Sequence, residues 1–155
     1  MKKKNTNIKR CDLNEGIAIC GLPIVPIDVN GKTCYFLLDT GAQNNGVSDA
    51  DPEALACFKP SEYVIQNTGL DGHSCFTPLG SLSYSIAGHS FEDQFSIIPG
   101  STFASIKQTT GLLISGIMGI TFMVKHNCVL DFDKGLVSII IQEENDNNDN
   151  EVIAA

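Results

Sequence analysis

The most informative segment of the chain is CYFLLDTGA, residues 34–42. Its five apolar residues are typical of a buried strand, and Asp39 follows them directly before a turn that contains Gly41. A carboxylate at the end of a buried strand is costly unless it accepts hydrogen bonds, and a glycine lets backbone amides approach it closely. The tripeptide Asp39-Thr40-Gly41 is by itself also an ordinary turn after a strand. The rest of the chain must therefore decide between a site and a turn.

Strand and turn signals follow one another along most of the chain. Asn30-Gly31 is a strong hairpin signal between the strand candidates 24–29 and 33–38. Further short strand candidates recur at regular spacing, at 63–67, 76–85, 91–98, 112–114, 129–132 and 136–141. The segments 49–58 and 121–126 are the helix candidates. This pattern predicts an all-β barrel or sandwich.

A second apolar element ends in Ile117-Met118-Gly119, and Gly119 lies 80 positions after Asp39. The run VLDF, residues 129–132, follows it after one helix candidate. The Asp39-Thr40-Gly41-Ala42 motif, the apolar-apolar-glycine element and the VLDF run, in this order, resemble the retropepsin-like (retroviral-type, clan AA) aspartic proteases. The resemblance covers roughly residues 22–141.

The resemblance implies a closed β-barrel or sandwich with three further features. The strand that ends in Gly119 would thread between the two arms of the catalytic loop (a ψ-shaped motif), with Ile117 and Met118 as packing residues. One short helix would lie near the C-terminus. A flap hairpin would cover the cleft, and a passive surface loop is the equal alternative for it. The candidate residues for its tip are Thr68, Gly69, Leu70, Asp71 and Gly72.

The chain departs from the family pattern directly after Ala42. Many relatives have a small hydroxyl residue or an aspartate there, whereas this chain has Gln43-Asn44-Asn45-Gly46. We therefore expect altered contacts to the substrate backbone. Gly46 replaces a more usual β-branched residue, and we expect it to loosen the strand that leads away from the loop.

For function, the resemblance implies an aspartic endopeptidase that hydrolyses peptide bonds, with Asp39 as the catalytic residue. Only one Asp-Thr-Gly motif is present, so a second copy would complete the site in a homodimer. A water activated between the two Asp39 carboxyls would attack a polypeptide substrate. Thr40 would hydrogen-bond across the dimer, and Gly41 would present backbone groups to the carboxylate and the substrate. No metal or cofactor is required.

Two other function classes stay open. A retropepsin-like domain can serve dimerisation or peptide binding with little or no turnover, because a fold does not guarantee an activity. A redox or metal protein would be built on the six cysteines, Cys11, Cys20, Cys34, Cys57, Cys75 and Cys128. The lack of a Cys-x-x-Cys pair and the scattered positions of His73, His89 and His126 speak against this class.

Composition and charge bound the remaining possibilities. The length of 155 residues fits one domain. We expect a flexible lead-in at 1–15, the protease domain at 16–142 and a disordered acidic tail at 143–155. The net charge of −8 disfavours a nucleic-acid partner because nothing would offset phosphate repulsion. No apolar run is long enough for a signal peptide or a membrane span, so we expect a cytoplasmic protein with reduced thiols and no membrane partner.

Overall fold

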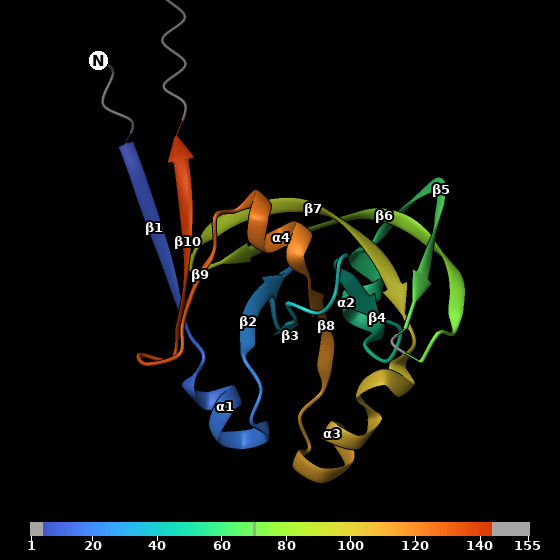
Figure 1. Cartoon of the computed structure of the whole chain (residues 1–155). Helices are drawn as coiled ribbons and strands as arrows, with labels where there is room; N and C mark the ends of the chain where they lie inside the picture. The colour runs from blue at the N-terminus through green and yellow to red at the C-terminus, as the bar shows by residue number, and fades with distance from the viewer. Residues whose placement is uncertain (1–4, 70, 144–155) are drawn as a thin grey trace, which may run out of the picture.

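The computed structural model describes residues 5–69 and 71–143 of the chain. Strands dominate these residues, as Figure 1 shows. In chain order the elements are β1 Asn5–Asp12, α1 Asn14–Cys20, β2 Ile24–Val29, β3 Lys32–Leu38, β4 Gly46–Ser48, α2 Pro52–Cys57, β5 Lys59–Thr68, β6 Ser74–Ile86, β7 His89–Ile98, the 3-10 helix η1 Gly100–Phe103, α3 Ala104–Thr110, β8 Ile114–Met118, α4 Ile120–Lys125, β9 Val129–Asp131 and β10 Leu136–Glu143.

Most strands belong to one sheet that closes on itself. Its strand order is β2-β3-β8-β4-β7-β6-β5, and an extra pairing of Asp28 in β2 with Ser85 in β6 closes six of these strands into a barrel. β5 lies at the edge of the sheet and pairs with β6. The turn that joins β2 to β3 has φ of 52° at Asn30 and 82° at Gly31, the backbone that an Asn-Gly hairpin requires. The predicted all-β barrel is confirmed, with 52% of the residues in strands.

The N-terminal segment is part of the fold, so the predicted flexible lead-in is wrong for residues 5–15. β1 pairs antiparallel with β10 along its whole length, and β9 completes a three-stranded sheet. Cys11 and Leu13 are buried in the main core. The sequence did not predict β1 because it is mostly polar and its partner strand lies near the other end of the chain. The structure does not describe residues 1–4. It also does not describe residues 144–155, which make up the expected acidic tail beyond β10.

The described residues contain four short α-helices, two more than the two helix candidates of the sequence. α2 and α4 match the helix candidates 49–58 and 121–126. α1 and α3 were not predicted, because seven residues are too few to show a helical period. Their only clear signals are Gly21 and Gly111, which follow the helices in the left-handed conformation with φ of 71° and 76°. None of the described helices is both long enough and apolar enough to cross a bilayer.

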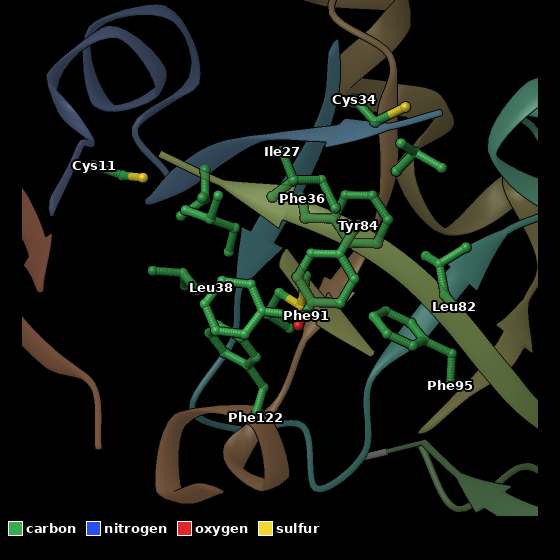
Figure 2. Packing of buried hydrophobic residues seen from close by; sticks show 14 of the residues in the cluster. Cys11, Ile27, Cys34, Phe36, Leu38, Leu82, Tyr84, Phe91, Phe95 and Phe122 are labelled. Atoms are coloured by element: carbon green, nitrogen blue, oxygen red, sulfur yellow. The ribbon is translucent and has the colours of Figure 1, made fainter. Parts of the chain in front are cut away.

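The main core is organised around five aromatic rings from β3, β6, β7 and α4 (Figure 2). Phe36, Phe95 and Phe122 are almost completely buried. Tyr84 stacks on Phe91 with ring centroids 5.5 Å apart and meets Phe95 edge-on at 5.9 Å. Aromatic rings bury more apolar surface than other side chains, so this cluster holds α4 firmly against the barrel.

A buried carboxylate, Asp93 on β7, ties α4 to the barrel beside this core. Its side chain is 3% exposed and contacts Tyr84 Oη at 2.5 Å, Lys125 Nζ at 2.5 Å and His126 Nε2 at 2.8 Å. Burial by itself opposes ionisation, but the hydrogen bonds with His126, Lys125 and Tyr84 outweigh it and lower the pKa of the carboxyl to about 2. Burial and the neighbouring Asp93 raise the pKa of the Tyr84 hydroxyl, which therefore remains a donor.

Asp93→Asn should destabilise the protein in a pH-dependent way. The folded-state pKa lies below the unfolded value of about 3.9, so the ionised carboxylate stabilises the fold above that pH. We expect a loss of about 2 kcal/mol at about pH 6 that shrinks as the pH falls from about 4 toward 2. Urea unfolding at a series of pH values measures it.

Asp133→Asn is the matched control, because this exposed carboxyl lies in the turn between β9 and β10. It should stay within about 0.5 kcal/mol of the parent at every pH. A loss for Asp93→Asn that stayed constant down to about pH 2 would contradict the assignment of a stabilising ionised carboxylate.

Candidate active site

Asp39 follows the last residue of β3 and begins a tight turn. Its side chain is partly exposed, and its Oδ1 accepts a hydrogen bond from the Gly41 amide at 2.8 Å. The Ala42 amide donates to the Asp39 carbonyl at 3.2 Å and closes the turn, whose exposed tip is Thr40. The structure therefore places one accessible, hydrogen-bonded carboxylate at the end of a buried strand. We call residues 39–45 the Asp39 loop.

β8 lies between the two strands that flank the Asp39 loop. It runs parallel to β3, with Leu38 paired to Met118, and antiparallel to β4, with Gly46 paired to Ile117. The Asp39 amide donates to the Met118 carbonyl at 3.0 Å, and the Met118 side chain is fully buried. The structure thus brings the Ile117-Met118-Gly119 element and Asp39 together.

The residues that follow β8 hold the outer part of the same loop. The amides of Ile120 and Thr121, at the start of α4, donate to the carbonyls of Ala42 and Gln43 at 2.8 and 3.1 Å. Gly119 lies so close to the loop that a Cβ there would stand 2.7 Å from the Ala42 carbonyl oxygen. Consecutive residues 118–121 therefore brace the Asp39 loop, and only glycine fits at position 119 without displacing it.

Gly46 packs tightly, so the expectation that it loosens the strand after the loop is wrong. All of β4 is buried between β7 and β8. A Cβ at position 46 would stand 2.6 Å from Cγ2 of Ile98. A Cβ added at Gly116 of β8 would stand closer still, 2.2 Å from the Gly46 carbonyl oxygen. A β-branched residue at position 46 has no space in this packing.

Asn45 is a buried polar residue that supports the Asp39 loop. The sequence did not predict this role. Its Nδ2 donates to the Gln94 carbonyl at 3.1 Å, and its Oδ1 accepts from the Gly119 amide at 3.0 Å. Its own carbonyl accepts from the Ser96 amide at 3.0 Å. The sequence shows an asparagine next to an apolar strand, but its partners lie on segments that are distant in the chain.

The flap candidates lie at the tip of the β5–β6 hairpin (Figure 1). Thr68, Gly69, Asp71 and Gly72 belong to this tip, and Leu70 lies outside the described residues. The Gly69 amide donates to the His73 carbonyl at 2.8 Å. Gly72 has φ of 81°, a left-handed conformation that favours glycine. Glycine is therefore favoured at position 72 of this turn.

The hairpin is joined to the Asp39 loop through β7. Asn67 Nδ2 in β5 donates to Ser96 Oγ at 3.0 Å, and the Ser96 amide donates to the loop carbonyl of Asn45. On the other strand, Thr77 Oγ1 donates to the Ile97 carbonyl at 3.0 Å. Polar contacts thus anchor both hairpin strands to the strand behind the loop.

The cysteines and the grouping of possible metal ligands bear on the alternative of a redox or metal protein. They contain no group of three His, Cys, Asp or Glu side chains that could hold a metal ion. Burial raises the pKa of Cys34 to about 11 and that of Cys128 to about 12, so these thiols are poor nucleophiles near neutral pH. A cavity of about 330 Å³ beside α1, β2 and β3 is lined by none of the predicted site residues.

Comparisons of the chain with protein-family models and with curated proteins find no match. The chemistry of the site therefore has to be inferred from its own geometry. That geometry is one accessible acid–base group, bonded to the Gly41 amide and placed on a loop that β8 and the start of α4 brace.

Gly119→Ala should displace the Asp39 loop and destabilise the fold. The added methyl group would meet the carbonyl oxygens of Ala42 and Asn44 at 2.7 and 2.6 Å, so the loop has to move. We expect a loss of about 1–3 kcal/mol in urea unfolding. The amide resonances of residues 41–45 should shift in the NMR spectrum.

Gly72→Ala is the control for this substitution. Position 72 has φ of 81° and no heavy atom within 4 Å of the added Cβ, so the change strains only the local backbone. We expect a loss of about 1 kcal/mol with unshifted loop resonances. Parental stability and unshifted loop resonances in Gly119→Ala would refute the close packing.

Proposed function

We propose that the chain is an aspartic endopeptidase that hydrolyses peptide bonds as a homodimer, with Asp39 as the catalytic residue of each copy. The observation that carries the proposal is the passage of β8 between the two arms of the Asp39 loop. This passage, the accessible carboxylate beside Gly41 and the β5–β6 hairpin are features that the resemblance to retropepsin-like proteases implies together. The closed six-stranded barrel supports the same proposal.

The proposed chemistry depends on a pair of carboxyls. Two Asp39 side chains that face each other across a two-fold axis cannot both ionise cheaply, so they hold one proton between them. The carboxylate takes a proton from a bound water while the carboxylic acid protonates the oxygen of the scissile carbonyl. The water oxygen bonds to the carbonyl carbon and gives a neutral gem-diol. The C–N bond then breaks as the protonated carboxyl gives its proton to the amine nitrogen and the other carboxylate takes a proton from a hydroxyl of the gem-diol, so the pair again holds one proton.

The single motif supports a site that is shared between two copies. The chain contains one Asp-Thr-Gly sequence, whereas acid–base catalysis by a carboxyl pair needs two acids. Asp39 and Thr40 lie at an accessible turn, where a second copy can approach about a two-fold axis. The Thr40 hydroxyls would then brace the two loops, and Gly41 would present backbone groups to the substrate.

A peptide-binding module with little turnover is the second candidate, and exposed apolar side chains on the hairpin favour it. Phe76 is 74% exposed and Val64 63% exposed. β5, which carries Val64, is an edge strand, and an extended peptide can pair with such an edge. Both candidates share the fold, so they differ only in what the Asp39 carboxyl does.

Asp39→Asn should abolish cleavage without unfolding the protein. An amide cannot share and transfer a proton as the carboxyl pair does, so cleavage of an unfolded polypeptide at mildly acid pH should fall by about 10³-fold or more. The turn should survive because the side-chain oxygen of Asn can still accept the Gly41 amide. Release of acid-soluble peptides measures cleavage, and thermal unfolding measures the fold.

Two controls accompany this variant. An inhibitor of aspartic proteases should block the parent, and Asp133→Asn, an exposed carboxyl in the β9–β10 turn, should cleave like the parent. Parental cleavage by Asp39→Asn would refute the endopeptidase. Equal peptide binding by both proteins, with cleavage by neither, would favour the binding module.

Specific activity should fall on dilution, because each complete site needs two copies. Sedimentation should show a dimer at concentrations that support cleavage, and the rate per chain should become proportional to protein concentration once the dimer dissociates. An excess of Asp39→Asn chains should suppress the parent by forming mixed dimers. A monomer that cleaves peptide with unchanged specific activity would contradict the shared site.

A further inference from the structure

One peptide group joins Asn45 to Asp39, although the two residues lie at opposite ends of the Asp39 loop. The Met118 carbonyl accepts the Asp39 amide at 3.0 Å, and the Gly119 amide of the same peptide group donates to Asn45 Oδ1 at 3.0 Å. Hydrogen bonds that share a peptide group polarise and strengthen each other. The side chain of Asn45 and the backbone of Asp39 are therefore coupled across β8.

The Asn45 amide has only one orientation that satisfies its neighbours. Its Nδ2 faces the Gln94 carbonyl at 3.1 Å, and its Oδ1 faces the Gly119 amide and, at 3.5 Å, Thr121 Oγ1. A flipped amide would set an N–H against an N–H and an oxygen against a carbonyl. The residue is 3% exposed, so the loss of these hydrogen-bond partners would be costly. Asn45 consequently holds the segments around it in one arrangement.

Hydrogen bonds also connect Asn45 to the β5–β6 hairpin. The Asn45 carbonyl accepts from the Ser96 amide at 3.0 Å and from Ser96 Oγ at 3.4 Å. The same Oγ accepts from Asn67 Nδ2 in β5 at 3.0 Å. Asn45 therefore contacts β7 directly and is connected to the hairpin through Ser96.

From these contacts we infer that Asn45 is a positioning residue, which sets the place of Asp39 through the Met118–Gly119 peptide group. The inference rests on the proposed endopeptidase function. Asn45 acts through the backbone and needs no contact with the reacting atoms. Loss of its hydrogen bonds would shift Asp39 without removing it, so kcat should fall more than KM rises.

The charged groups that face Asn45 come from β7 and α4. Asp93 and Lys125 line the same cavity of about 200 Å³ as Asn45, and its other lining residues are Asn44, Leu79, Gln94 and Thr121. Lys125 Nζ lies 2.5 Å from the Asp93 carboxylate, so these two charges already offset each other. A carboxyl introduced at position 45 would therefore find the cation of this cavity already paired.

Asn45→Asp tests the inference because its hydrogen bonding changes with pH. The protonated carboxyl can donate to the Gln94 carbonyl and accept from the Gly119 amide, as the parent amide does. The ionised form cannot donate and would repel that carbonyl. We expect kcat relative to the parent to fall about tenfold near neutral pH and to recover as the pH is lowered. A relative kcat that does not vary with pH would overturn the inference.

Ile139→Ala separates positioning from a general loss of stability. Ile139 is fully buried in β10, which does not pair with the strands beside the Asp39 loop. Its truncation should lower the melting temperature at least as much as Asn45→Asp, with kcat of the folded protein unchanged. A drop in kcat equal to that of Asn45→Asp would show that stability alone is responsible, and would overturn the inference.

The Gly41 amide provides a readout that needs no activity. It donates to Asp39 Oδ1, so its NMR chemical shift reports the placement of the Asp39 side chain. The difference between Asn45→Asp and the parent should be large at neutral pH and should shrink on acidification. If neither protein cleaves peptide, the proposed function fails, but this difference still decides the inference. An unchanged Gly41 resonance at neutral pH would overturn it.

Discussion

The fold and the site both depend on the insertion of β8 between β3 and β4. β8 satisfies the hydrogen bonds of both flanking strands, so it completes the barrel and braces the Asp39 loop at the same time. The insertion requires backbones to pass very closely. A Cβ added at Gly116 or Gly119 would stand only 2.2 or 2.6 Å from the nearest carbonyl oxygen. These glycines are therefore demanded by packing, whatever the protein does.

Buried carboxylates hold this fold together, whereas the proposed catalytic carboxyl is accessible. Asp93 anchors α4, and Asp51 begins α2 and accepts Ser115 Oγ at 2.6 Å. Burial opposes the ionisation of both groups, but their hydrogen bonds outweigh it and lower both pKa values. Perturbed pKa values often mark functional sites, yet here they mark the scaffold. In the proposed enzyme, the second copy would supply the other carboxyl of the pair.

Hydrogen bonds connect β7 to both the hairpin and the Asp39 loop. Ser96 accepts Asn67 of the hairpin and donates to Asn45 of the loop. In the proposed enzyme, a hairpin that closes on a substrate would therefore transmit its movement to the loop that carries Asp39.

Most barrel strands, the Asn30-Gly31 turn and the turn at Asp39 could be predicted from the sequence, because each depends on residues close together in the chain. α1 and α3 escaped prediction because seven residues do not show a helical period. The pairing of β1 with β10, the support of the loop by Asn45 and the tight packing of Gly46 became visible only in the folded structure. Each of these features depends on segments that are distant in the chain and come into contact only on folding, and no local sequence pattern encodes such contacts.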